Sequence, residues 1–204
     1  MLLIPVRHGE TEWNAEGREI GQLDSPLTAR GLEQAEALAR RLSGFKIDAL
    51  YSSDLGRAQR TAETIARCCR TSVHIDVTLR ERHMGAFQGL TADEVRAQYP
   101  AERRAYERHG YYEVIPGGET ARQRQDRSRE VLTRMAARHA GETVVLVTHS
   151  GMLTGFFETV LALPSGSSRL FKKSHAAFNA FEYHSSIWSL VTWNDTRHLE
   201  DTKD

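Results

Sequence analysis

The chain has 204 residues, 27 basic and 27 acidic side chains, and an apolar fraction of 40%. This length suits a single domain over residues 1–204 and leaves little room for a second core. The zero net charge argues against nucleic acid or a membrane surface as a partner, and no apolar run is long enough to cross a bilayer.

Three elements are predicted first along the chain. Leu2–Val6 reads as a buried strand, too short to be the apolar region of a signal peptide. Pro5 cannot donate to a ladder, so we expect it to mark the end of pairing. Thr28 is expected to cap a helix whose apolar residues recur at helical spacing up to Leu42. A second strand follows over residues 47–51.

The next helix and strand close the first half of the chain. Asp54 is expected to cap a helix that runs to about Arg67, and residues 73–79 are expected to form a third strand. The cysteines of the sequence, Cys68 and Cys69, are adjacent and offer no disulfide framework. This usage of cysteine favours a reducing, cytoplasmic location.

The segment over residues 91–118 has a looser pattern. We expect short helices there, broken at Pro100, at Gly110 and at Pro116–Gly118. Long irregular stretches often cover a binding site, so this segment is predicted to be a lid-like insertion. Tyr106, Tyr111 and Tyr112 are candidates to line it.

The second half of the chain alternates helices and strands again. A long helix over 119–139, a strand over 143–147, a helix to about residue 163, and two antiparallel strands over 177–181 and 187–193 are expected, with a frayed tail from residue 195. This alternation predicts an α/β fold, a three-layer sandwich whose central sheet is mostly parallel with helices on both faces.

Two histidines directly follow predicted strands. His8 comes after the first strand, and His149 comes after the strand over 143–147. Ligands of open α/β sheets gather at the carboxyl ends of strands, so the two imidazoles can converge there, and Gly9 would let the backbone approach a ligand. Taken singly, such a histidine is more often structural, and Arg57 and Glu81 would each be an ordinary surface charge.

Six blocks in a fixed order change that weighting. Together they resemble the histidine phosphatase superfamily, which includes cofactor-dependent phosphoglycerate mutases and many small phosphatases. The blocks are Arg7-His8-Gly9-Glu10-Thr11 with Trp13-Asn14, Asp24-Ser25-Pro26-Leu27-Thr28 with Gly31, Ser52-Ser53-Asp54-Leu55 with Arg57-Ala58 and Thr61-Ala62, Leu79-Arg80-Glu81 with Gly85 and Gly89, Gly117-Gly118-Glu119, and Thr148-His149-Ser150-Gly151.

The resemblance implies a role for each matching residue. His8 would be the nucleophile that becomes phosphohistidine, and Glu81 would donate a proton to the leaving group. The phosphoryl oxygens would be surrounded by Arg7, Arg57 and His149. Further phosphate or substrate contacts are implied for Asn14, Gly21 and Ser150.

These residue types suit metal-independent phosphoryl transfer. The reaction needs an in-line nucleophile and positive charge around the equatorial oxygens, which two arginines and a protonated His149 would supply. His8 must be neutral, with one ring nitrogen held by an acceptor, and Glu81 should be protonated when the substrate binds. The sequence contains no phosphate-binding loop of the G-x-x-x-x-G-K-[ST] type, which excludes one competing phosphate chemistry. The histidines show no H-E-x-x-H spacing, so no metal site is expected.

The resemblance leaves phosphatase and mutase both open. Family mutases carry a longer insertion after the acid, whereas residues 82–116 form a short segment, and Ile20 stands where mutases tend to have a small hydroxyl residue. A phosphatase for small phosphomonoesters is therefore favoured. Against it, Glu81-Arg82-His83 resembles the mutase motif, and Arg103-Arg104 could replace the paired arginines that hold a substrate carboxylate, although a solvated helix face is the more ordinary reading.

The expected partner is a small phosphorylated metabolite. No cofactor is expected for a phosphatase, whereas a mutase would be primed by 2,3-bisphosphoglycerate. A catalytically inactive relative that binds phosphorylated ligands is a third hypothesis, disfavoured because every core position is filled. The sequence does not indicate which phosphomonoester is used, nor the oligomeric state, for which a homodimer is one option.

Overall fold

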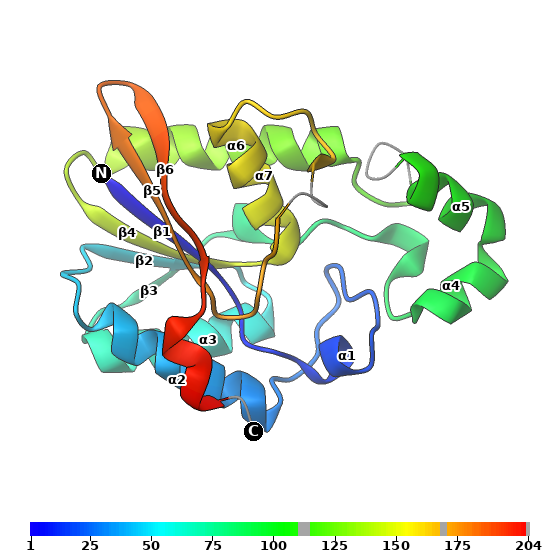
Figure 1. Cartoon of the computed structure of the whole chain (residues 1–204), viewed down its shortest axis with the longest axis horizontal. Coiled ribbons are helices and arrows are strands. Elements are labelled where there is room, and N and C mark those ends of the chain that lie inside the picture. Colours follow the sequence, from blue (N-terminus) through cyan, green and yellow to red (C-terminus); the bar gives the residue numbers. More distant parts are fainter. Residues whose placement is uncertain (110–114, 168–170, 203–204) are drawn as a thin grey trace.

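A computed structural model describes residues 1–109, 115–167 and 171–202, and within this part of the chain a six-stranded sheet lies between two layers of helices (Figure 1). Its strands are β1 (Leu2–Arg7), β2 (Ala49–Ser52), β3 (Val73–Ile75), β4 (Thr143–Thr148), β5 (Phe178–His184) and β6 (Ile187–Asp195). The order across the sheet is β3-β2-β4-β1-β5-β6; the first four pair in parallel, β5 is antiparallel to β1, and β6 is antiparallel to β5. The predicted three-layer, mostly parallel architecture is confirmed.

Helices cover both faces of this sheet, and further helices lie beside it. They are α1 (Glu12–Ala15), α2 (Ala29–Leu42), α3 (Gly56–Cys69), α4 (Ala92–Gln98), α5 (Pro100–His109), α6 (Ala121–Arg138) and α7 (Ser150–Val160), with short 3-10 turns η1 (Val77–Leu79), η2 (Gly85–Phe87) and η5 (Arg197–Thr202). In Figure 1, α6 and α7 lie on one face, and α2 and α3 lie on the other.

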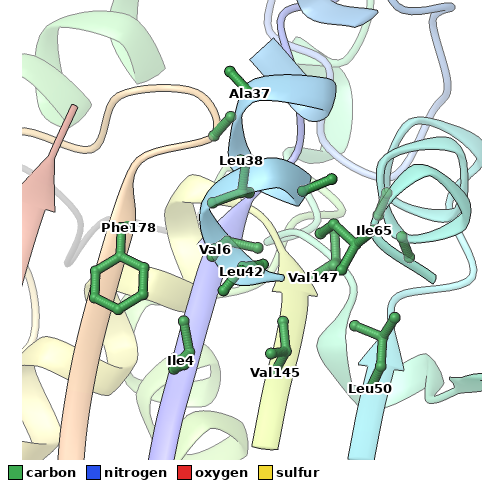
Figure 2. Close-up of a cluster of buried hydrophobic side chains, with 14 of the residues drawn as sticks. Ile4, Val6, Ala37, Leu38, Leu42, Leu50, Ile65, Val145, Val147 and Phe178 are labelled. Atoms are coloured by element: carbon green, nitrogen blue, oxygen red, sulfur yellow. The ribbon is translucent and has the colours of Figure 1, made fainter. Parts of the chain in front are cut away.

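The period of two along the central strands builds both cores. On the face of α2 and α3, Ile4 and Val6 of β1 pack beside Val145 and Val147 of β4 (Figure 2). The alternate residues of the same strands, including Leu3, pack against α6 and α7. Each of these side chains is fully buried, and each contributes about 1.5–3 kcal/mol on leaving water. The two central strands are therefore held rigidly, and their ends are well defined.

Pro5 does not end the strand, contrary to the prediction. β1 pairs with β4 in register from Leu2 to Arg7, straight through Pro5. On the other side, β1 pairs with β5 only at Leu2 and Leu3. There the Pro5 carbonyl accepts from the side-chain amide of Asn179 at 2.9 Å. The missing N–H therefore falls on the side where ladder pairing has already stopped.

One helix cap is as predicted and the other is wrong. The Thr28 hydroxyl accepts from the Gly31 N–H at the start of α2. Asp54 does not cap α3, because its carboxylate accepts two hydrogen bonds from the Arg80 guanidinium instead. An N–H in the first turn of α3 is taken by Asp24, a residue distant in sequence, at 3.3 Å.

Two other elements are shorter or more ordered than expected. The strand predicted over 73–79 ends at Ile75, because the Asp76 carboxylate accepts from the Thr78 N–H and starts η1. The tail is not frayed over Arg197–Thr202, where η5 contacts α2 and Leu199 is buried in the core.

The segment predicted as an insertion contains α4 and α5, which lie beside the sheet layers in Figure 1. The break at Pro100 is confirmed, since α4 ends at Gln98 and α5 begins at Pro100. A small separate cluster, built from Met84, Phe87, Val95 and Ile115, packs beneath these helices. The break predicted at residue 110 and the tyrosines at 111 and 112 lie outside the described residues.

Candidate active site

The two histidines meet because the strands before them are neighbours. The β1–β4 register pairs Arg7 with Thr148, so His8 and His149 leave the sheet side by side. The His8 N–H donates to the Thr148 carbonyl at 3.0 Å, and the two ring centroids lie 5.1 Å apart. Both side chains are buried. The carboxyl edge of the sheet therefore holds two imidazoles in one place.

The tautomer of His8 is set by the backbone. Its Nδ1 lies 2.7 Å from the Gly9 carbonyl, which can only accept, so Nδ1 carries the proton. Burial, followed by the charge of Arg57, holds the pKa of His8 well below its usual value. The ring is neutral near pH 7, and the lone pair on its Nε2 accepts a hydrogen bond from Arg57 Nε at 3.2 Å. This is the protonation state that a nucleophile requires.

Gly9 permits a close approach between the His8 segment and α2. A Cβ on Gly9 would lie 2.2 Å from the Gly31 carbonyl oxygen in α2, so the close approach is to this helix. The Gly9 N–H also donates to the Thr61 hydroxyl of α3 at 3.1 Å. The segment that carries His8 is thereby held between two helices.

Arg57 is held on every nitrogen of its guanidinium. Besides the contact with His8, Nη1 donates to the Leu23 carbonyl at 2.7 Å and to Asp24 at 3.2 Å, and Nη2 donates to the Gly21 carbonyl at 2.7 Å. The side chain is 1% exposed. Gly21, expected to bind phosphate or substrate, lines the pocket and also orients this arginine.

Arg7 and His149 retain unused polar atoms beside His8. Arg7 donates through Nη1 to the Lys173 carbonyl at 2.9 Å. Its Nε and both ring nitrogens of His149 are buried without a hydrogen-bond partner among the described residues. Leaving such groups unsatisfied costs about 1–3 kcal/mol each. Atoms of this kind beside a nucleophile are suited to bind an oxyanion.

The surroundings of His149 disfavour the protonated form that the sequence analysis expected to act on the phosphoryl oxygens. Burial lowers the pKa of His149 well below its usual value, and the neighbouring Arg57 and Arg7 lower it further. The same burial lowers the pKa of Arg7 to about 10, which still leaves that residue charged near pH 7. The two arginines therefore carry the positive charge, and His149 gains a proton only if an anion compensates it.

Glu81 lies at the rim, against the start of α7. Its carboxylate accepts from the Gly151 N–H at 2.9 Å, from the Arg82 N–H at 2.7 Å and from the Ser150 hydroxyl at 3.1 Å. All three of these residues line the same pocket as Glu81 and His8. Ser150, expected to contact phosphate or substrate, is thus engaged with the candidate acid.

The block that contains Glu119 supports the backbone around Glu81. The Glu119 carboxylate binds the Arg127 guanidinium at 2.7 Å, and Arg127 donates in turn to the Arg80 carbonyl at 2.7 Å. The Glu119 carbonyl accepts from Arg82 Nε at 2.6 Å. The loop on both sides of Glu81 is therefore tied to α6.

Asn14 lies at the site through its capping role. Its Oδ1 accepts from the Thr11 N–H and hydroxyl, which closes the capping box of α1, and from His175 Nε2 at 3.0 Å. The sequence analysis missed His175, whose ring centroid lies 5.6 Å from that of His8. Burial, followed by Arg7, lowers the pKa of His175 to about 2. No local pattern distinguishes this histidine.

The pocket that contains His8 and Glu81 is also lined, toward its opening, by residues that the sequence analysis did not place at the site. Its wall includes Arg18, Glu19, Arg82 and Lys173, with Ile20, Met84 and Tyr106. Burial, followed by Arg7, lowers the pKa of Lys173 to about 8. Glu19 lies 3.8 Å from Arg103 of α5, so this arginine is not merely on a solvated face. Within the described ranges, no group of three or more His, Cys, Asp or Glu residues is placed to hold a metal.

Comparison with known proteins agrees with this geometry. Residues 3–196 match the family model of the histidine phosphatase superfamily, branch 1. Phosphoglycerate mutase-like protein 4 of Arabidopsis thaliana is 38% identical over 203 residues, covering 98% of this chain and 87% of the relative. The metal-independent phosphoserine phosphatase of the same plant is 38% identical over 200 residues, with coverages of 97% and 82%.

Solved structures give the same assignment. Bacillus stearothermophilus YhfR superposes with a TM-score of 0.90 at 32% identity, covering 98% of this chain and 99% of that one. A mycobacterial glucosyl-3-phosphoglycerate phosphatase, in complex with VO3, has a TM-score of 0.85 at 31% identity, with coverages of 95% and 99%. No helix in the described part of this chain is long and apolar enough to span a membrane. With residues 3–196 matched, including both histidine blocks, the chain belongs to the histidine phosphatase superfamily.

Proposed function

We propose that this protein is a metal-independent, cytoplasmic phosphatase that hydrolyses small phosphomonoesters through a phosphohistidine at His8. The observation that carries the proposal is the set of buried, unpartnered nitrogens of Arg7 and His149 beside a neutral imidazole. This arrangement offers a lone pair to phosphorus and hydrogen-bond donors and positive charge to the phosphoryl oxygens.

In the first half-reaction, His8 Nε2 attacks phosphorus as the bond to the ester oxygen breaks. The leaving alkoxide takes a proton from the Glu81 carboxyl, and the product alcohol departs. In the second half-reaction, water attacks the phosphohistidine, Glu81 takes the proton from that water, and the N–P bond breaks to release inorganic phosphate. Acid–base help of this kind typically contributes about 10²–10⁴-fold to the rate.

Phosphatase rather than mutase activity is favoured by the wall of the pocket that contains His8. The apolar side chain of Ile20 lines it, and the segment between Glu81 and Gly117 is short. We propose that the insertion over residues 91–118 forms a lid, because Tyr106 of α5 lines the pocket. The relative named as a mutase-like protein supports the second candidate, a phosphoglycerate mutase primed by 2,3-bisphosphoglycerate.

A trapping experiment tests the proposal. The enzyme is mixed with a phosphomonoester, quenched in alkali to preserve phosphohistidine, and the modified peptide is located by mass spectrometry. We expect the phosphoryl group on His8 and complete loss of turnover in His8→Ala, with a melting temperature close to that of the wild type. A fully active His8→Ala variant would refute the nucleophile assignment.

Activity assays then separate the two candidates. Phosphorylated metabolites, including phosphoserine and 3-phosphoglycerate, are assayed for free phosphate. Isomerisation of 3-phosphoglycerate is measured with and without 2,3-bisphosphoglycerate. We expect release of free phosphate. Isomerisation that depends on the bisphosphate, with little phosphate released, would establish the mutase instead.

A further inference from the structure

A buried ion pair lies behind the candidate acid and has no part in the mechanism above. Arg124 of α6 and Glu158 of α7 meet with Nη2 and Oε2 at 2.5 Å, and their side chains are 1% and 0% exposed. Such a pair usually stabilises a fold no better than well-packed apolar residues would, because both charges lose their hydration. The position of the pair is therefore of interest.

Arg124 is joined to Glu81 through a single residue. Its Nη1 donates to the Gly151 carbonyl at 3.0 Å, while the Gly151 N–H donates to the Glu81 carboxylate at 2.9 Å. A Cβ at position 151 would lie 2.1 Å from Glu81 Oε1, so only glycine permits this approach. The backbone of Gly151 thus has the arginine on one side and the acid on the other.

The second oxygen of Glu158 is also fully used. Its Oε1 accepts from the Gly166 N–H at 2.9 Å and from the Ser167 N–H at 2.7 Å. The carboxylate is therefore fixed at both oxygens, and it orients Arg124 from the far side of the guanidinium. Arg124 cannot turn away from Gly151 without breaking a buried charge pair, which is strongly unfavourable.

We propose that Arg124 and Glu158 are positioning residues that hold the first turn of α7 so that its donors orient the Glu81 carboxyl. This inference rests on the acid–base role proposed for Glu81. If the turn shifts, the Ser150 hydroxyl and the Gly151 N–H shift with it, and the carboxyl loses its alignment with the leaving oxygen. Misplacement of a catalytic group by about 1 Å can cost about 10²-fold in rate.

The test compares two leaving groups. Aryl phosphates need little protonation to leave, whereas alkyl phosphates need it strongly, so p-nitrophenyl phosphate and β-glycerophosphate are assayed side by side. The variants are E81Q, R124M/E158Q and the triple combination. The double variant removes both buried charges and keeps an acceptor oxygen for the Gly166 and Ser167 N–H groups. R134M, which removes an arginine elsewhere on α6, is the matched control.

We expect R124M/E158Q to lower kcat/KM, which reports the half-reaction in which the leaving group departs, about tenfold more for the alkyl ester than for the aryl ester. It should cause no further loss in the E81Q background, because the pair acts only through Glu81. R134M should slow both substrates equally, if at all. R124K provides a second variant with the buried charges retained. Its single ammonium cannot hold both partners in the same geometry, so we expect it to slow the alkyl ester more than the aryl ester, by a smaller factor than R124M/E158Q.

Two results overturn the inference while leaving the acid role intact. In the first, E81Q slows the alkyl ester more than the aryl ester, but R124M/E158Q and R124K slow the two esters equally. The other is a triple variant in which the fold-loss of rate equals the product of the losses in E81Q and in R124M/E158Q. By contrast, an E81Q variant that lowers kcat/KM equally for both esters would overturn the acid role itself, because kcat/KM reports the half-reaction in which the leaving group departs. Melting temperatures of all variants separate misfolding from misplacement.

Discussion

Gly9→Ala is expected to damage catalysis through a backbone collision. The added Cβ would lie 2.2 Å from the Gly31 carbonyl oxygen, where ordinary contact begins at 3.4 Å, so one backbone must retreat by more than an ångström. The obstacle is helix backbone in α2 and not the flexible end of a side chain. Overpacking of this kind costs about 1–3 kcal/mol, and a domain of this size loses about 2–4 °C in Tm per kcal/mol.

Catalysis should suffer more than stability. The Gly9 carbonyl holds His8 Nδ1, so a displaced backbone turns the nucleophile away from in-line attack. We expect kcat for p-nitrophenyl phosphate to fall about 10²-fold. The control is Gly44→Ala, because a Cβ there meets only the Arg41 carbonyl at 3.5 Å. Steady-state kinetics and thermal melts of both variants decide the matter. A Gly9→Ala enzyme with the kinetics and Tm of Gly44→Ala would refute the steric reasoning.

Three further expectations concern charge. The pKa of Lys173 is lowered to about 8, so its ammonium is present below that pH and lost above it. We therefore expect KM for a phosphomonoester to rise above pH 8 in the wild type. The same rise in a Lys173→Met variant would contradict this assignment. Turnover should be unchanged after EDTA treatment, and activity that vanishes with EDTA and returns with a divalent ion would contradict the metal-free mechanism. Asp24 is half exposed where it binds Arg57, so Asp24→Asn should raise KM by no more than about fivefold; a loss of several hundredfold would show that this pair does more.

Several features of this protein were determined by the sequence alone. The continuous apolar runs of β1 and β4 predicted buried strands, and the alternation of strands with amphipathic helices predicted two helical layers around them. The blocks around His8 and His149 come directly after these two strands. The Thr28 cap could also be predicted, because a capping side chain and the N–H that it binds lie three residues apart. These signals are short in range, and the carboxyl ends of neighbouring parallel strands must share an edge.

Other features were decided only by the tertiary structure. Asp24 rather than Asp54 contacts the start of α3, since the partner of a carboxylate depends on which distant arginine comes within reach. The neutral state of His149 follows from burial beside two arginines, which no sequence spacing reports. His175 and Lys173 join the site from a chain segment far from every recognised block. A pKa, a partner and a pocket wall all depend on three-dimensional proximity, which the sequence specifies only through the whole fold.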